Sequence, residues 1–186
     1  MHPLLHKNDP LLKQPCLNFD FDTGYSLANG DRIDAPELFD ILRTRMCENR
    51  GVGLAAPQIG IMTRVFVIGN SSDPENVISV FNPRIVDASA EFELYEEGCL
   101  SFPDLYLKIK RPMHIRTRFT NHLGVTDTVK FTGFTSRIFQ HEYDHLDGLL
   151  YTKRATSYHL ELAKNQLKSL NRLRKRTSTT REHANG

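Results

Sequence analysis

The sequence has none of the features of a disulfide-stabilised or membrane-spanning protein. Its 186 residues include no tryptophan and only three cysteines, Cys16, Cys47 and Cys99. An odd number of cysteines in a chain long enough to bury its own core favours a reducing compartment, where a cysteine is a core residue or a ligand. No apolar run is long enough to cross a membrane, and the first residues lack the basic start and apolar core of a secretory signal. We therefore expect a cytoplasmic protein without a membrane partner.

Net charge is small, but the two signs are unevenly distributed. The chain has 24 Lys and Arg against 22 Asp and Glu, a net charge of +2. Residues 151–186 contain nine basic residues and two acidic ones, a net charge of +7, which leaves −5 for residues 1–150. A basic end on an acidic body suggests an anionic partner, although basic helix faces are often simply solvated.

Local patterns predict helices and short strands in alternation. Three stretches have the apolar period or the start and stop residues of helices, namely 34–50, 136–146 and 157–174. Asp34 is the expected cap at the start of the first helix, and Gly148 is expected to end the second. Four stretches are rich in β-branched and aromatic residues and bounded by turn formers, namely 64–68, 77–82, 114–119 and 125–131. The mixture predicts an α+β fold with mostly antiparallel strands, and the polar residues 177–186 are expected to be irregular.

The helix predicted over residues 136–146 contains a His-Glu-x-x-His motif, formed by His141, Glu142 and His145. Positions four apart lie on one face of a helix, so the two imidazoles could hold one metal ion with the carboxylate beside it as general base. A motif this short also fits a solvated polar helix, and two histidines do not complete a metal site. The motif therefore indicates a metal-dependent hydrolase only if a further ligand exists.

Two other stretches contain candidates for completing such a site. The further ligand could be Asp, Glu, His or Cys, and Cys99 in EGCLS is one candidate, although a lone cysteine is commonly a buried apolar residue. The stretch GVGLAAPQ, residues 51–58, consists largely of small residues, which let backbone approach a ligand closely. It ends in the amide of Gln58, a neutral donor, but would also suit a plain loop.

Taken together, the three stretches resemble the signature motifs of the peptide deformylase family. They are GVGLAAPQ, EGCLS and QHEYDHLDG, in this order and with similar spacing, and residues 4–15 resemble the N-terminal segment of the family. The resemblance covers roughly residues 4–151. It implies a catalytic domain over residues 1–154 with a central helix that carries the His-Glu-x-x-His motif, then a basic amphipathic helix over residues 155–176 and the irregular tail 177–186.

Deformylases remove the formyl group from the N-terminal formyl-methionine of new polypeptides. The resemblance implies three ligands for one divalent metal ion, with a fourth position left for the attacking water: Cys99, His141 and His145. It also makes Glu142 the general base, and it makes the side-chain amide of Gln58 and the N–H of Leu100 the donors to the oxyanion. Fe(II) is the expected ion, with zinc, nickel or cobalt as alternatives.

The resemblance further implies a pocket for the methionine side chain next to the metal. Six residues match substrate-binding positions of the family, namely Val52, Gly53, Tyr95, Ile138, Glu97 and Arg111. Of these, Glu97 and Arg111 are expected to form an ion pair that braces the strand carrying Cys99. Taken singly, Val52, Tyr95 and Ile138 could equally be ordinary core residues. Glu97 and Arg111 could equally form an ion pair on the protein surface. The expected partners are N-formylmethionyl peptides and, through the basic helix, the ribosome rather than DNA, in the cytoplasm of a bacterium or of a phage-infected bacterial cell.

Two other classes of protein remain open on the residues alone. A different zinc peptidase would share the His-Glu-x-x-His motif, but such enzymes usually complete the site with His or Glu rather than with a cysteine. A non-catalytic RNA-binding protein could retain an inactive deformylase body. The presence of Gln58, Cys99 and the full helix motif argues against that second class.

Overall fold

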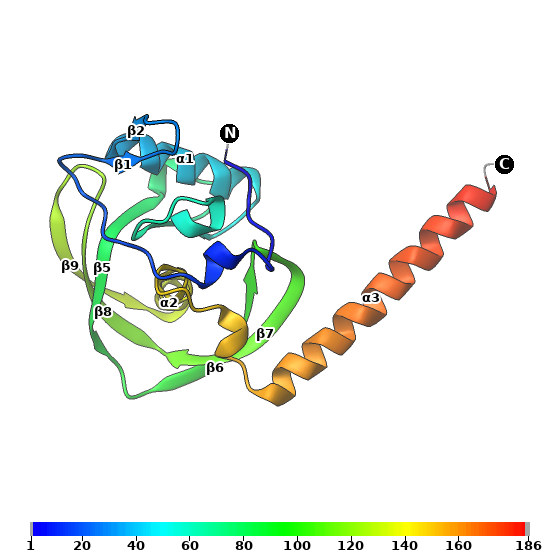
Figure 1. Ribbon diagram of the computed structural model, residues 1–186. Coiled ribbons are helices and arrows are strands. Elements are labelled where there is room, and N and C mark those ends of the chain that lie inside the picture. The colour runs from blue at the N-terminus through cyan, green and yellow to red at the C-terminus, as the bar shows by residue number, and fades with distance from the viewer. Residues whose placement is uncertain (1, 185–186) are drawn as a thin grey trace.

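The computed structural model describes the backbone of residues 2–184 and the side chains of residues 2–174. A compact body is followed by one long helix that projects from it (Figure 1). The body contains two α-helices, α1 (Ala35–Glu48) and α2 (Gly133–Leu146), and the projecting helix is α3 (Ser157–Ala184). Short 3-10 helices cover Pro10–Lys13, Ala56–Ile59, Pro74–Asn76 and Tyr151–Lys153.

The strands form three antiparallel groups, and two of them pack around α2 (Figure 1). A five-stranded sheet has the order β3-β4-β5-β8-β9, with β3 and β9 at its edges. Its strands are β3 (Gly53–Ala55), β4 (Val65–Ile68), β5 (Ile78–Ala88), β8 (His114–Thr120) and β9 (Thr126–Thr132). A hairpin of β6 (Phe92–Cys99) and β7 (Phe102–Pro112) and a short pair, β1 (Tyr25–Ser26) and β2 (Arg32–Ile33), complete the body. The predicted α+β class is confirmed.

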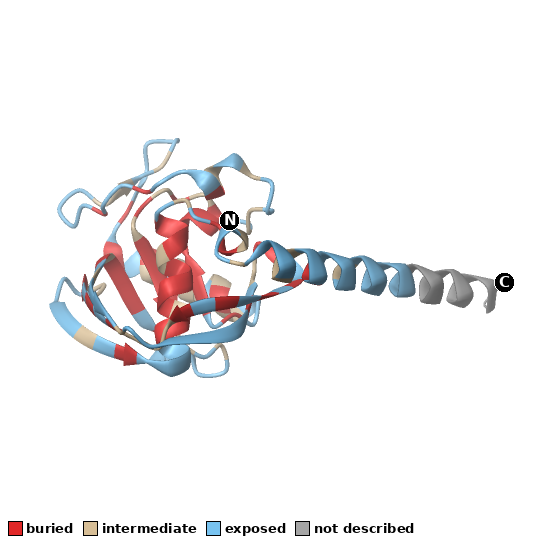
Figure 2. Cartoon of the chain, turned by 90° about the horizontal axis from the view of Figure 1, so that it is seen from below, coloured by how far each residue is buried: buried red, intermediate tan, exposed pale blue. Residues whose placement is uncertain are grey.

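Helix α2 is buried on two chemically different faces (Figure 2). One face carries Phe139, which is fully buried and packs edge-on against Phe66 of β4 at a centroid distance of 4.9 Å. The other carries buried polar residues, including His141 and His145, which are 7% and 2% exposed. Because buried polar groups are costly unless they are paired, this second face requires partners from the strands around it.

The ends of α1 and α2 follow from particular residues. Asp34 caps α1 by accepting a hydrogen bond from the Glu37 N–H at 2.9 Å, as the sequence predicts. Gly148 lies just beyond α2 with a φ of 68°. A Cβ at this position would lie 2.7 Å from the backbone of Lys13, so the N-terminal segment packs where only glycine fits.

Two elements differ from the sequence-based expectation. The β6–β7 hairpin was not predicted, because β6 is largely exposed and its charged residues mask a strand pattern. Helix α3 was expected to end near Arg174 but continues to Ala184, so residues 177–184 are helical rather than irregular. No glycine or proline lies between residues 157 and 184 to stop the helix. Residues 185–186 lie outside the described part of the chain.

Helix α3 packs on the body through its first turns (Figure 2) and, further along, Arg174 Nη1 lies 2.6 Å from Asp104 Oδ2 of β7. Leu160, Ala163 and Leu167 pack on a cluster that includes Leu107 and Ile109 of β7. The first turns of α3 therefore belong to the same core as β7. The expected division into a catalytic domain that ends at residue 154 and a separate helix stays a prediction. Within residues 2–184, no helix has both the length and the apolarity needed to cross a membrane.

Candidate metal centre

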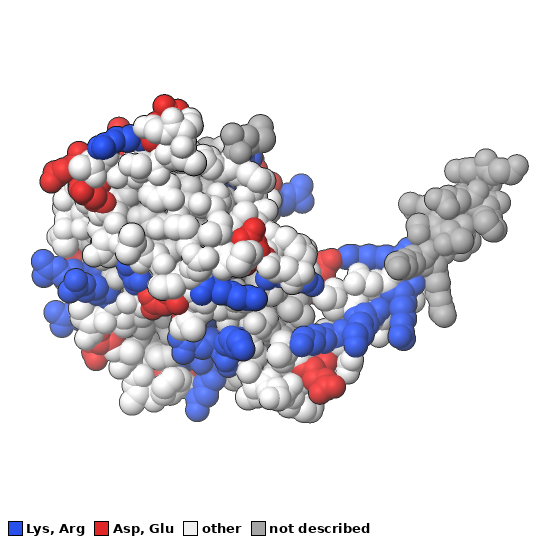
Figure 3. Space-filling model, viewed as in Figure 1, with Lys and Arg blue, Asp and Glu red and all other residues white. Residues whose placement is uncertain are grey.

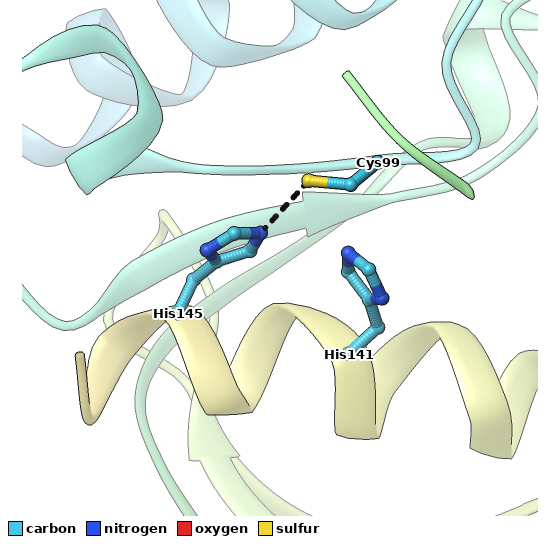
Figure 4. A group of neighbouring side chains, drawn as sticks. All are labelled: Cys99, His141 and His145. Carbon is cyan, nitrogen blue, oxygen red and sulfur yellow. Dashed lines mark hydrogen bonds between the residues drawn. The ribbon is translucent and has the colours of Figure 1, made fainter. Parts of the chain in front are cut away.

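Three potential metal ligands from two elements converge in the body (Figure 4). Cys99 is the last residue of β6, and His141 and His145 lie one turn apart on α2. Their ligand atoms all lie within 4.8 Å of one another, and Cys99 Sγ is 3.3 Å from His145 Nε2. One sulfur and two imidazole nitrogens suit a tetrahedral divalent metal ion with one position left open, so this group could hold such an ion.

The two imidazoles are held differently. His141 Nδ1 lies 3.0 Å from Glu97 Oε2, which leaves its Nε2 for a metal. His145 turns Nε2 towards Cys99, and its Nδ1 is buried without a hydrogen-bond partner among the described residues. Burial lowers the pKa of His145 well below its ordinary value, which keeps this imidazole in the neutral form that a metal requires.

Glu97 is the centre of a buried ion network that joins the hairpin to α2. Arg111 donates to both of its oxygens, from Nε at 2.6 Å and from Nη2 at 2.9 Å. Arg137 of α2 donates to Oε1 at 2.9 Å. Burial by itself would raise the pKa of Glu97, but the hydrogen bonds from His141 and Arg111 outweigh burial and lower that pKa to about 2. The carboxylate therefore stays charged while it orients a metal ligand.

The network extends behind α2 through Asp144. Arg111 Nη1 lies 2.8 Å from Asp144 Oδ2, and Arg154 Nη2 lies 2.6 Å from Asp144 Oδ1. The side chain of Arg154 is 48% exposed, whereas those of Arg111 and Asp144 are buried. The ion pair predicted between Glu97 and Arg111 is therefore present, but it is buried rather than on the surface.

Glu142 lies between the ligand group and β3. It is 5% exposed, and its Oε2 has no hydrogen-bond partner among the described residues. Burial raises the pKa of its carboxyl group to about 7. A Cβ at Gly53 would lie 2.5 Å from Glu142 Oε1, so the position of the carboxylate depends on a glycine in β3. This contact explains why the second glycine of the GVGLAAPQ motif, Gly53, has no room for a side chain.

Two donors face the same region from other elements. Gln58 Oε1 accepts a hydrogen bond from the Ala55 N–H at 2.8 Å, and this bond directs Nε2 towards Cys99 Sγ at 3.6 Å and Ser101 Oγ at 3.3 Å. Leu100 lies in the turn between β6 and β7, and its N–H donates to no other group among the described residues. Both residues thus present N–H donors beside the ligand group, and that of Leu100 has no other acceptor among the described residues.

Two hollows meet at His141 and Glu142. The first has a volume of about 330 Å³, and its lining includes four of the predicted substrate-binding residues, Val52, Tyr95, Glu97 and Ile138. The second is lined by Gly53, Gln58, Cys99 and Leu100. Arg111 lines neither of these two hollows and lies in the ion network, paired with Glu97 as expected, so any role of Arg111 at the substrate stays a prediction.

Sequence reasoning missed several residues of the first hollow, namely Phe134, Arg137 and Tyr106. Arg137 and Phe134 had a detectable signal, because they lie four and seven residues before His141 and so share its helix face. Tyr106 had none, since its place depends on the hairpin that the sequence did not predict.

Comparison with known proteins agrees with this geometry. The profile of the family described as polypeptide deformylase matches residues 1–161. The chain belongs to the polypeptide deformylase family. It is 45% identical over 104 residues to the peptide deformylase of Thermotoga neapolitana, a match that spans 56% of this chain and 62% of that protein. It is also 40% identical over 126 residues to the peptide deformylase of Thermotoga petrophila. That match spans 68% of this chain and 75% of that protein.

The fold of the chain is also similar to a solved deformylase structure. The crystal structure of the peptide deformylase from Thermotoga maritima superposes with a TM-score of 0.72 at 32% sequence identity. The superposition covers 84% of this chain and 98% of that one. The likeness therefore includes most of the body described above.

We expect the ligand group to bind one divalent ion per chain. Cys99→Ala should lower the metal content measured by elemental analysis several-fold, because it removes one of three ligands. Cys47→Ala is the matched control, since Cys47 lies outside the ligand group and should leave the metal content unchanged. Equal metal content in the intact chain and in Cys99→Ala would contradict the assignment.

We also expect the ion network to contribute strongly to stability. Arg111→Met should lower the free energy of unfolding in urea by about 3–5 kcal/mol, because it leaves Glu97 and Asp144 buried with fewer partners. The control is Arg43→Met, which breaks a half-exposed pair with Asp40 and should cost about 1 kcal/mol or less. A similar loss of unfolding free energy in the two variants would mean that the buried network stabilises the protein no more than a surface ion pair does.

Proposed function

We propose that this protein removes the formyl group from the N-terminal formyl-methionine of newly made polypeptides and releases formate. The observation that carries the proposal is the convergence of Cys99, His141 and His145 beside the buried carboxylate of Glu142, in a chain of the deformylase family. A formamide is an amide, so its hydrolysis needs activated water, stabilisation of an oxyanion and a proton for the leaving amine.

The ligand group would hold one divalent ion, which we take to be Fe(II) on the family resemblance, with zinc, nickel or cobalt as alternatives. When bound, such an ion supplies Lewis acidity, which lowers the pKa of water and polarises a carbonyl oxygen. The side chains around it then carry out the proton transfers and the positioning.

Glu142 would act as the general base and then as the general acid. Its Oε2 has no partner among the described residues, so it is free to accept a proton from the attacking water. The same carboxyl group would then pass this proton to the amine that leaves. Gly53 supports the step because its missing side chain leaves room for the carboxylate.

Gln58 and Leu100 would stabilise the negative charge that develops on the formyl oxygen. The Gln58 amide is fixed by the Ala55 N–H with its donor end towards Cys99, and the Leu100 N–H has no other acceptor in the described chain. Donors that are already oriented act more strongly than water, because they need no reorganisation during the reaction.

The methionine side chain would occupy the first hollow, between Val52, Tyr95 and Ile138. The peptide backbone would run along β3, which is an edge strand and therefore has an unpaired side. Gly53 in this strand would meet the substrate through its backbone. This arrangement places the formyl group at the junction of the two hollows, beside Glu142.

Formate release measures the proposed activity directly. Protein purified without oxygen and loaded with Fe(II) or Ni(II) should release formate from formyl-Met-Ala. Glu142→Gln should retain the metal and lose formate release, since it keeps the shape but not the base. Gln58→Ala should lower kcat by about 10² to 10³, as the loss of other oxyanion donors does. A metal-loaded wild type that releases no formate would overturn the proposal.

We also propose that α3 docks on ribosomal RNA. Lys164, Lys168 and Arg172 lie four residues apart on the exposed side of this helix, which is rich in basic side chains (Figure 3). A basic stripe on a projecting helix suits the phosphate backbone of RNA, and such binding weakens as salt rises.

Charge reversal tests the docking surface. Changing Lys164, Lys168 and Arg172 to Glu should abolish co-sedimentation with ribosomes at low salt and leave formate release intact. The matched control reverses three exposed basic residues on the β8–β9 hairpin, Arg116, Arg118 and Lys130, and should still co-sediment. Equal co-sedimentation of both triple variants would remove α3 as the docking element.

A further inference from the structure

The hollow assigned to the methionine side chain has one cationic wall. Its lining includes apolar side chains, Val52, Phe134 and Ile138, but also the guanidinium-bearing Arg137. Arg137 is only 4% exposed. Its pairing with Glu97 compensates the cost of burying the charge, but that pairing does not require a guanidinium to border a pocket for an apolar side chain.

Arg137 is held rigidly in this wall. Its Nη1 donates to Glu97 Oε1 and to the Ile109 carbonyl, both at 2.9 Å, and its Nη2 donates to the Glu93 carbonyl at 2.9 Å. The guanidinium also lies 5.6 Å from the centre of the Tyr95 ring. Contacts on these sides leave the guanidinium little freedom to rotate.

These contacts do not use all the donors of Arg137. A guanidinium has five N–H groups, and the three hydrogen bonds above come from Nη1 and Nη2. The Nε–H has no acceptor among the described residues, and Nε is not one of the fully buried atoms left without a partner. The Glu93 carboxylate lies 3.7 Å from Nη2, so Nε–H is the donor of Arg137 left without a partner among the described residues, in a side chain that lines the hollow.

We propose that Arg137 extends the substrate range to formyl peptides whose first residue is methionine sulfoxide. This inference rests on the proposed function. The sulfoxide oxygen is a polar acceptor at the point where methionine has only a weakly accepting sulfur. A wholly apolar pocket would reject it, because the oxygen would lose its hydrogen bonds to water. The guanidinium N–H replaces those bonds, while the apolar walls still accept methionine.

A comparison of two peptides isolates this contribution. Formyl-norleucine-Ala has an apolar side chain of methionine's length, and formyl-Met-sulfoxide-Ala adds the acceptor. Their dissociation constants would be measured by calorimetry on Ni(II)-loaded Glu142→Gln, in which turnover does not interfere. Arg137→Met in that background should weaken sulfoxide binding relative to norleucine binding by about ten-fold or more, as expected for loss of a hydrogen bond to a charged group.

Two further variants keep the test decisive. Ile138→Val alters an apolar wall and should leave the ratio of the two dissociation constants unchanged. Arg137→Gln keeps a neutral amide donor, so the ratio should change in the same direction but less, and it replaces Arg137→Met if that variant does not fold. A ratio that Arg137 substitutions leave unchanged, with both peptides weakened equally, would overturn the inference and leave Arg137 a positioning residue for Glu97.

Binding and turnover separate this inference from the proposed function. Absence of formate release by the metal-loaded wild type, together with a changed ratio in Arg137→Met, would overturn the activity but support the role of Arg137. Formate release together with an unchanged ratio of dissociation constants would support the activity but overturn the role of Arg137 in sulfoxide binding.

Discussion

The structure depends on the pairing of one buried negative charge, the carboxylate of Glu97, with neighbouring donors. Its side chain lies where the β6–β7 hairpin meets α2, 4% exposed, and it is paired at once with Arg111, Arg137 and the imidazole of His141. A buried charge that loses its partner costs several kcal/mol, so this contact strongly resists partial separation. Since Cys99 lies two residues further along β6, the contact that compensates Glu97 also brings the thiol to the histidines.

The candidate metal centre and the hollow beside it are therefore products of the same packing. Helix α2 turns Phe139 towards the apolar core and turns His141 and Glu142 towards the hairpin and β3. The ligands come from a strand end and from a helix, so they converge only in the folded chain. Metal binding and folding should consequently support each other. Arg137 lies on this same face and joins the ion network to the wall of the pocket.

Local patterns predicted the α+β class, the cap of α1 and the stop of α2 at Gly148, because these depend on neighbouring residues. The grouping of Cys99 with the helix motif came from a family resemblance and not from periodicity. The hairpin, the burial of the Glu97–Arg111 pair and the role of Arg137 were not foreseen, since charged residues ordinarily indicate a surface. Their burial depends on partners distant in sequence, which a local pattern does not contain.

We propose that a cysteine of β6 and two histidines of α2 bind the same ion. X-ray absorption spectroscopy of the zinc-loaded protein tests it most directly, because sulfur and nitrogen ligands lie at different distances. We expect one sulfur at about 2.3 Å and nitrogen or oxygen ligands at about 2.0–2.1 Å from the zinc ion. A spectrum with nitrogen and oxygen ligands alone would contradict it.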